Sequence, residues 1–200
     1  LIDWVNAVLA SGDVPEVFVI DDEMDITMYR ISYEQISGNQ GHWSDLSNDE
    51  ISTVRELMDT MIPTPSGCFI QGFSHWPLKS IGVEHLSGIN LRQEEINWIS
   101  TKLTGDVQQE ALFSHLTELG CVLRPGFKYG CKWRVYDDDV GKSHAPWLLQ
   151  PITEAPVSWE QTCLSVRLAE GVHKKWVCGL KEDIADWKFL HIKRWLPGRV

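Results

Sequence analysis

Residues 118–136 read ELGCVLRPGFKYGCKWRVY, and the structural pattern of the chain changes within this stretch. Gly120 is of the type that commonly ends a helix. Two runs rich in apolar and aromatic side chains follow on either side of Pro125 and Gly126, and residues 145–152, APWLLQPI, extend the pattern. Such runs between turn residues are typical of β-strands, so we expect a sheet from residue 121 onward.

A helix is predicted well before this stretch. Residues 47–50, SNDE, form a capping box, and apolar residues follow at helical spacing until Pro63. Residues 66–89 are short apolar pieces broken by glycine and proline. We interpret them as small strands and turns.

Two further helices are predicted between these strands and the sheet. Asn90 with Gln93 predicts a helix over about 91–103, and Asp106 predicts another that ends at Gly120.

The C-terminal part combines one helix with strands. Ser158 with Gln161 predicts a helix that ends near Gly171, and the segments KWVCGL and WKFLHIKRW predict the last two strands. The predicted fold class is therefore α+β, with mixed sheets, flanking helices and a small α/β domain before the C-terminal sheet.

An internal repeat links the two ends of the chain. Residues 9–19, LASGDVPEVFV, match residues 168–178, LAEGVHKKWVC, in Leu, Ala and Gly at an offset of 159 positions. Each copy precedes an acidic turn and a strand, so the order helix, strand, acidic loop, strand occurs twice. We interpret residues 1–38 as the end of a degenerate, non-catalytic repeat of a domain at 106–200, with a separate α/β domain at 39–105.

The composition is that of a globular protein. Of 200 residues, 43% are hydrophobic and 23% charged, which is enough to bury one or two cores. No apolar run approaches the roughly 18 residues of a membrane helix, and residue 1 falls inside a predicted helix, so we expect no membrane span and a preceding segment. The five cysteines lack metal-ligand spacing, which favours reduced thiols in a cytoplasm and predicts neither metal nor cofactor.

Charge is unevenly distributed along the chain, whose net charge is −10. Residues 1–123 hold 5 lysines and arginines against 19 acids, whereas residues 124–200 hold 13 against 9. A basic C-terminal part joined to an acidic remainder suggests an anionic partner for the basic part, although a solvated surface would give the same counts.

A tyrosine and a histidine lie eight positions apart around an acidic turn. Residues 134–147 read RVYDDDVGKSHAPW, with Tyr136 and His144 at the two ends of the turn. Taken singly, Tyr136 is more often a packed aromatic, His144 a satisfied polar group, and Lys174 a solvated charge.

Together these residues stand in a family pattern. Residues 118–136, the segment SHAPW, and residues 165–177, SVRLAEGVHKKWV, resemble the catalytic domain of the archaeal tRNA-splicing (tRNA-intron) endonucleases. The resemblance extends over about 106–200 and implies a nuclease domain of that fold. Carried over residue by residue, it places the family's catalytic residues at Tyr136, His144 and Lys174.

The family chemistry requires these three residue types. Cleaving RNA without a metal needs a base for the 2′-hydroxyl, an acid for the departing 5′-oxygen, and a cation beside the phosphorane. The resemblance implies that Tyr136 is the base, His144 the acid and Lys174 the electrostatic stabiliser, giving a 2′,3′-cyclic phosphate and a 5′-hydroxyl. Because an unperturbed phenol has a pKa of about 10, the base needs help from nearby positive charge.

The resemblance also implies RNA-binding and assembly residues. The family holds a bulged base between two arginines, which fall on Arg167 and, without a clear alignment, on Arg194. An acidic loop of a non-catalytic domain inserts into a basic cleft of a catalytic partner. That loop corresponds here to Asp21, Asp22, Glu23 and Asp25. We therefore expect precursor tRNA as substrate, and a homo- or hetero-oligomer in which a missing segment or partner chain completes the first domain.

Two other functions remain open at this point. The chain could be a non-catalytic RNA-binding subunit of the same assembly, or a general metal-independent ribonuclease. The loop from Tyr136 to His144 is slightly short for the family, and Asp137 to Asp139 lie on the approach of a polyanion. The intact Tyr136, His144 and Lys174 argue against a non-catalytic role. The lysine is absent only from the front copy, where Pro15 stands at the position of Lys174.

Overall fold

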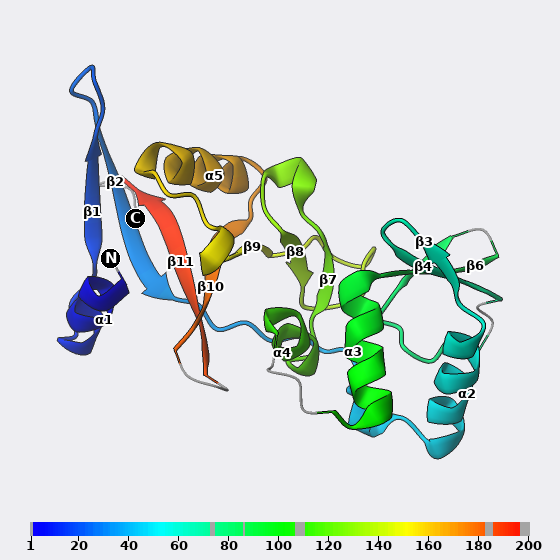
Figure 1. The fold of residues 1–200 in the computed structure, drawn as a ribbon. Coiled ribbons are helices and arrows are strands. Elements are labelled where there is room, and N and C mark those ends of the chain that lie inside the picture. The colour runs from blue at the N-terminus through cyan, green and yellow to red at the C-terminus, as the bar shows by residue number, and fades with distance from the viewer. Residues whose placement is uncertain (1, 73–74, 86, 107–110, 183–185, 197–200) are drawn as a thin grey trace. The chain divides into compact units, whose positions relative to one another are not determined.

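The computed structural model describes residues 2–72, 75–85, 87–106, 111–182 and 186–196 (Figure 1). It is an α+β structure, as predicted, and the described residues form one seven-stranded and one four-stranded sheet. Within the described residues, no helix is long and apolar enough to cross a bilayer.

The chain divides into two compact units. The first contains residues 1–36, 124–136 and 144–200, and the second contains residues 37–123 and 137–143. The expected boundary at 38/39 falls within two residues of a unit boundary, whereas the one at 105/106 coincides with none.

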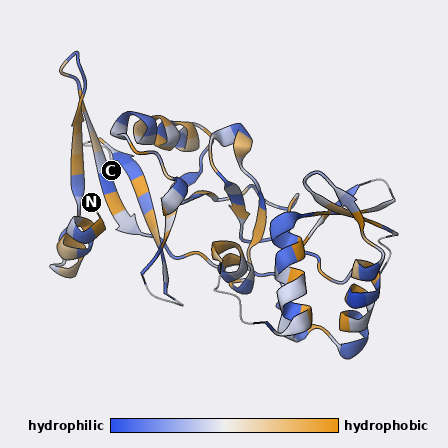
Figure 2. Ribbon diagram, viewed as in Figure 1, coloured by the Kyte–Doolittle hydropathy of each residue, from blue (hydrophilic) through white to orange (hydrophobic). Residues whose placement is uncertain are grey.

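The first unit holds most of the seven-stranded sheet, whose strand order is β1-β2-β11-β10-β9-β8-β7. The boundary between the units falls within β7. The strands are β1 (Glu16–Ile20), β2 (Ile26–Tyr33), β7 (Val122–Pro125), β8 (Trp133–Tyr136), β9 (Trp147–Pro151), β10 (Lys175–Lys181) and β11 (Trp187–Trp195). The helices are α1 (Ile2–Ala10) and α5 (Trp159–Gly171), with single turns at Phe127–Tyr129 and Ile152–Glu154. Polar and apolar bands alternate along β11, as expected for a strand with one face in a core (Figure 2).

Both helices of this unit contribute to one core. Ser158 caps α5 by accepting a hydrogen bond from the Gln161 amide, which confirms the predicted start of this helix. The core cluster draws residues from α1, α5 and the central strands, among them Val5, Tyr29, Ile31, Val166, Ala169, Trp176, Leu190 and Ile192.

The pairing of β2 with β11 relates the two ends of the chain by an approximate two-fold axis. Ile31 lies opposite Ile192, and Tyr33 lies opposite Leu190. In the repeat, Leu190 corresponds to Ile31 and Ile192 corresponds to Tyr33, each 159 positions later. A two-fold rotation that superposes corresponding residues therefore carries one of these pairs onto the other. Ser32 and His191, also 159 apart, lie opposite each other and mark the axis. The two segments that match in sequence are thus related by this axis, and their origin as a repeat stays a prediction.

The second unit holds the four-stranded sheet, in the order β3-β4-β6-β5, and three helices. Its strands are β3 (Ile62–Thr64), β4 (Gly67–Gln71), β5 (Val83–His85) and β6 (Gly88–Arg92). Its helices are α2 (Asn48–Asp59), α3 (Gln93–Thr104) and α4 (Leu112–Glu118), with a single turn at Trp43–Asp45. The capping box of α2 is formed as predicted, with Ser47 and Glu50 bonding reciprocally.

The predicted starts of α3 and α4 were wrong. Asn90 lies in β6, opposite Phe69 of β4, because sheet pairing continues as far as Arg92. The buried Glu95 then closes the first turn of α3 by accepting a 2.8 Å hydrogen bond from the Arg92 amide.

Asp106 likewise does not begin a helix that the structure describes. Its carboxylate accepts a 2.9 Å bond from the Thr104 hydroxyl at the end of α3, and α4 begins only at Leu112. Residues 107–110 of the predicted helix lie outside the described residues. The predicted end is close, since Gly120 has a φ of +76° just after α4.

Candidate functional site

The register of three neighbouring strands brings the ends of β8, β9 and β10 together. Val135 of β8 lies opposite Trp147 of β9, and Trp147 lies opposite Lys175 of β10. β8 runs antiparallel to β9, whereas β9 and β10 are parallel, so the end of β8 meets the beginnings of the other two strands. Tyr136 and Lys174 are each one position beyond this row.

Tyr136 and Lys174 also share a face of the sheet. Side chains alternate along a strand, so Tyr136 lies on the same side as Arg134, two residues earlier. Arg134 is opposite Leu148, and Leu148 is opposite Trp176, which follows Lys174 by two residues. With neighbouring strands about 4.8 Å apart, the backbones of Tyr136 and Lys174 are about 10 Å apart.

His144 approaches the same end of the sheet from the loop before β9. It lies three residues before Trp147, and its side chain is exposed, whereas Tyr136 is buried at 6% exposure. In the described part of the chain, no hydrogen bond joins the side chains of Tyr136, His144 and Lys174. The structure thus places all three predicted residues at one end of β8 to β10, with the histidine open to solvent.

Lys174 is anchored beside the histidine. Its ammonium donates a 2.6 Å hydrogen bond to the carbonyl of Ala145, the residue after His144. Its amide donates to the carbonyl of Ala169 near the end of α5, which fixes the turn between helix and strand. Burial, and then the positive charge of Arg134, lower the pKa of Lys174 below its ordinary value of 10.5.

Arg134 is a residue of this site that the sequence reasoning missed. Its guanidinium carbon lies 5.9 Å from the centre of the Tyr136 ring, within the range of a cation–π contact. Its Nε donates a 3.0 Å bond to the carbonyl of Pro125, which holds the side chain in place. The alternation of side chains along a strand could have found it, because it precedes Tyr136 by two residues.

The acidic turn after Tyr136 is compensated inside the second unit. Lys142 lies 2.5 Å from Asp139 and 3.7 Å from Asp138, and the Gln40 amide donates a 3.0 Å bond to Asp139. The hydrogen bonds from Lys142 and then Gln40 lower the pKa of Asp139. Two of the three aspartates therefore have partners within their own unit that offset their negative charge. This reduces the repulsion that they would exert on a polyanionic substrate.

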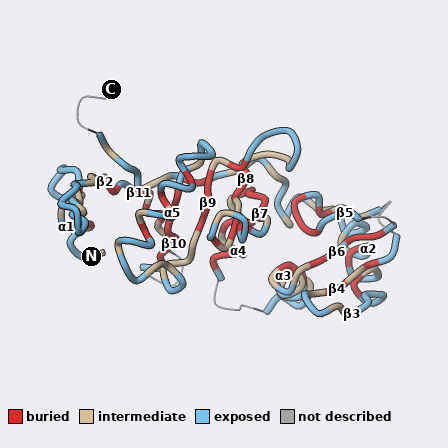
Figure 3. The backbone as a smooth tube through the Cα atoms, turned by 90° about the horizontal axis from the view of Figure 1, so that it is seen from above, coloured by how far each residue is buried: buried red, intermediate tan, exposed pale blue. Residues whose placement is uncertain are grey.

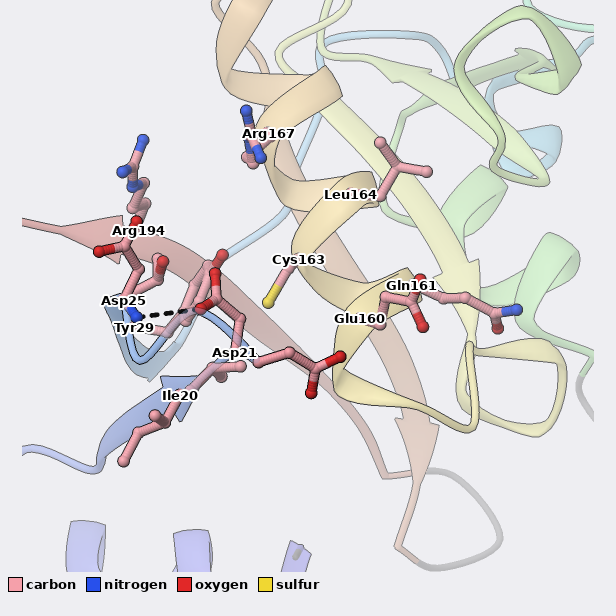
Figure 4. Close-up of a pocket in the computed structure, with 13 residues that line it drawn as sticks. Ile20, Asp21, Asp25, Tyr29, Glu160, Gln161, Cys163, Leu164, Arg167 and Arg194 are labelled. Atoms are coloured by element: carbon pink, nitrogen blue, oxygen red, sulfur yellow. Dashed lines mark hydrogen bonds between the residues drawn. The ribbon is translucent and has the colours of Figure 1, made fainter.

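The two predicted RNA-binding arginines line one cavity of about 660 Å³ in the first unit (Figure 4). Arg167 projects from α5, and Arg194 lies on β11 opposite Tyr29 of β2. The Arg194 amide donates a 2.8 Å bond to Glu170, which ties β11 to α5.

The predicted assembly loop faces the same cavity. Asp21, Asp22 and Asp25 are among the residues that line it, whereas Glu23 is not. Figure 4 shows Asp21 and Asp25 at this cavity. Asp21 also shapes the turn, because its carboxylate accepts bonds from the amides of Glu23 and Asp25 at 3.0 and 2.9 Å.

No group of three histidine, cysteine or acidic side chains is arranged to hold a metal ion within the described ranges. The cysteines in those ranges are free thiols. Burial raises the pKa of the Cys121 and Cys178 thiols to about 12, so these two behave as apolar core groups.

Comparison with known proteins gives a consistent picture. Residues 107–187 match the family model of the tRNA intron endonuclease, catalytic C-terminal domain. A tRNA-splicing endonuclease of Thermoplasma volcanium is 27% identical over 160 residues, covering 80% of this chain and 49% of the relative. Proteins of the same name from Methanopyrus kandleri and Natronomonas pharaonis are each 27% identical, over 52% and 93% of this chain and 59% and 60% of the relative. The chain thus spans about half to three fifths of the length of these relatives.

Proposed function

We propose, from the match of residues 107–187 to the catalytic domain of the tRNA intron endonucleases and from the similarity to tRNA-splicing endonucleases, that this chain is a member of that family and cleaves precursor tRNA at intron–exon junctions within bulge-helix-bulge RNA. One observation supports this proposal most: the register of β8, β9 and β10 gathers Tyr136, His144 and Lys174 at one end of the sheet. These side chains can serve as the base, the acid and the cation that metal-independent cleavage of RNA requires.

In the proposed reaction, the ribose 2′-oxygen attacks the adjacent phosphorus. Tyr136, as phenolate, takes the 2′-hydroxyl proton, and the bond between phosphorus and the 5′-oxygen breaks. His144, as imidazolium, gives its proton to that departing oxygen. The products are a 2′,3′-cyclic phosphate and a 5′-hydroxyl, and the reaction needs no oxidant or external nucleophile.

Positive charge on one face of the sheet would stabilise the phosphorane. The Lys174 ammonium is held at the Ala145 carbonyl, beside the proposed acid His144. Arg134 adds a second cation near Tyr136. Fixed positive groups aimed at developing negative charge are commonly the largest contribution to this kind of catalysis.

The exposed position of His144 fits the proposed role of an acid. The 5′-oxygen belongs to a polynucleotide that must approach from solvent, and an exposed imidazole is accessible to it. Because hydrogen bonds between catalytic groups often tighten only with substrate, the absence of such bonds among the described side chains is compatible with the mechanism.

Arg167 and Arg194 are proposed to hold a bulged base. They come from α5 and β11 and line a cavity large enough for a nucleobase (Figure 4). A guanidinium can stack on any base, so these contacts would recognise an unpaired base rather than its identity.

The acidic loop is proposed to hold two catalytic units together. Asp21, Asp22, Glu23 and Asp25 repel one another in isolation, whereas docking onto a basic surface of a partner would fix their position and depend on salt. Docking would also withdraw three acids from the cavity that holds Arg167 and Arg194. Replacing the four acids by Asn or Gln should dissociate the assembly in sedimentation and abolish cleavage. If the neutralised protein sediments and cleaves like its parent at moderate salt, the loop is only a solvated turn.

A strand outside the described residues is proposed to complete the front of the sheet. β1 has no outer neighbour in the part that the structure describes, whereas its counterpart β10 pairs in parallel with β9. Phe18 on β1 is 54% exposed, while Val177 at the equivalent position of β10 is fully buried. A preceding segment or a partner chain that adds a parallel strand would cover this face.

One experiment tests the proposed function. The full-length protein containing this chain is mixed with intron-containing precursor tRNA in EDTA, and the fragment ends are identified. Cleavage at both junctions with cyclic phosphate ends supports the proposal. Cleavage of unstructured RNA at the same rate indicates a general ribonuclease, and RNA binding without cleavage indicates a non-catalytic subunit.

A further inference from the structure

Glu34 carries a carboxylate from the front repeat to the strands of the candidate site. It follows β2, and its amide donates a 2.8 Å hydrogen bond to the carbonyl of Phe189 on β11. Its side chain is only 14% exposed. No feature of the proposed mechanism uses this partly buried acid.

The carboxylate contacts three residues of the catalytic half. One oxygen accepts a 2.7 Å bond from the Lys175 ammonium and a 3.1 Å bond from the Trp147 indole. The other oxygen lies 3.8 Å from Nδ1 of His191. A single group thus joins the first residues of β9 and β10, which are also paired with each other.

These contacts lie next to the proposed catalytic residues. Lys175 follows Lys174 directly, and Trp147 comes three residues after His144. Because side chains alternate along a strand, Lys175 and Lys174 point to opposite faces of the sheet. Glu34 therefore holds the two strands from one face of the sheet, while Lys174 lies on the other face, where it is bonded to the Ala145 carbonyl.

The carboxylate is charged in this environment. Burial opposes the charged form, but the hydrogen bonds from Lys175 and Trp147 outweigh it and lower the pKa of Glu34 below its ordinary value of 4.5. Burial lowers the pKa of His191, so this histidine is mainly neutral at pH 7. Charge-assisted bonds of this kind are shorter and stronger than neutral ones, which suits a group that must fix a position.

We infer that Glu34 is a positioning residue for the cleavage reaction: its contacts with Lys175 and Trp147 fix the starts of β10 and β9, and through them the places of Lys174 and His144. The inference rests on the proposed function. It assigns the front repeat a part in catalysis although this repeat lacks the lysine. A displacement of about 1 Å in a catalytic group can cost about 10²-fold in rate, so the loss of one fixed contact has a measurable effect.

The test compares variants of the full-length protein in single-turnover cleavage of precursor tRNA. Glu34→Ala removes all three contacts and should lower the cleavage rate by about 10- to 100-fold, with RNA affinity within about threefold of the parent. Glu34→Gln keeps an acceptor for Trp147 but loses the charge that Lys175 requires, so its rate should be intermediate. The Trp147 indole N–H resonance, assigned with Trp147→Phe, should shift in Glu34→Ala and much less in Glu34→Gln.

Glu16→Gln is the matched control. Glu16 is also a partly buried acid of the front repeat, paired with Arg30 at 2.9 Å on β1 and β2. Its substitution removes the same charge without touching β9 or β10, so the cleavage rate should stay within about twofold of the parent.

The outcomes separate this inference from the proposed function. If His144→Ala is inactive but both Glu34 variants cleave within about threefold of the parent, only the role of Glu34 is overturned. The same holds if RNA affinity falls by the same factor as the rate, because a positioning residue acts on the chemical step. A parent protein that fails to cleave overturns both.

Discussion

The front repeat and its counterpart at the C-terminus have the same elements but different surroundings. Helix α1 and strands β1 and β2 correspond to α5, β10 and β11, and the two strand pairs join across the two-fold axis. In the C-terminal copy, β9 and β8 cover the outer edge of β10. Strands β8 to β10 are largely buried (Figure 3), whereas most residues of β1 and β2 are only partly buried. An active site therefore needs the neighbouring strands as well as the repeated elements.

The position before the first strand shows the same difference at the level of one residue. Lys174 precedes β10 and Pro15 precedes β1, 159 positions apart. Proline has no ammonium, so the front copy has lost the cation. Because β8 and β9 have no counterparts in the described front repeat, a lysine there would have neither the tyrosine nor the histidine beside it.

The largest expected effect comes from removing His144, the proposed acid of the C-terminal copy. His144→Ala should lower the cleavage rate by about 10² to 10⁴-fold with RNA affinity nearly unchanged, because general acid catalysis commonly contributes that much. Single-turnover rates and filter-binding measure the two quantities. His173→Asn is the control, since His173 precedes Lys174 with a φ of +57° that Asn tolerates, and its rate should stay close to that of the parent. Equal rates for His144→Ala and the parent would remove His144 from the mechanism.

A second effect should separate RNA recognition from cleavage. Arg167→Ala is expected to weaken discrimination for a bulged substrate over a plain duplex by about 1–3 kcal/mol, the cost of losing one stacking contact. Competition binding between the two RNAs measures it. An unchanged preference would mean that the cavity shared by Arg167 and Arg194 does not hold the bulged base.

A third prediction sharpens the comparison between the two helices. Val5 of α1 is fully buried, so Val5→Ala should lower the free energy of unfolding by about 2 kcal/mol. Leu164, 159 positions later on α5, is 58% exposed, and Leu164→Ala should cost less than about 0.5 kcal/mol. Denaturant unfolding measures both. Similar losses would show that the two helices bury equivalent faces at this offset.

The smallest expected effect concerns pH. Lys174 must be protonated to stabilise negative charge, and its pKa is lowered, so kcat/KM should fall on the alkaline side below pH 10.5. Arg134→Gln removes a positive neighbour that disfavours protonated Lys174, so the pKa should rise and the alkaline limb should move to higher pH. The pH dependence of kcat/KM on short RNA checks this, and a shift to lower pH would contradict it.

Local signals in the sequence predicted most elements of the fold. The capping residues of α2 and α5 bond as expected, because a cap depends only on residues three positions apart. The same logic placed the start of α3 at Asn90, although that residue pairs with Phe69 in the sheet. Sheet pairing is non-local, so the sequence around Asn90 contains no sign of it.

The repeat was found through residues that are not all structural equivalents. The strands follow the offset of 159, but the buried faces of the helices follow 157, since Val5 then corresponds to the buried Thr162. Leu168 is 48% exposed, whereas Leu9 packs against the core. The connection between helix and strand thus differs in length by two residues between the two copies. The identical residues of the sequence match do not show this difference.

The candidate site was likewise predicted only in part from the sequence. The resemblance to the family pattern pointed to Tyr136, His144 and Lys174, and the strand register brings these positions to one end of the sheet. Glu34 could not be found, because its partners Trp147 and Lys175 lie 113 and 141 positions away. Contacts of that kind follow from topology, not from a local pattern.

The two-fold axis also determines which halves can associate. Glu34 contacts Lys175 across it, and the positions equivalent to these two, offset by 159, hold Lys193 and Glu16 with opposite charges. A union of two catalytic halves would bring Lys193 toward Lys175, and a union of two front halves would bring Glu34 toward Glu16. Like charges would disfavour both unions, so the charges at these positions favour the pairing of unlike halves.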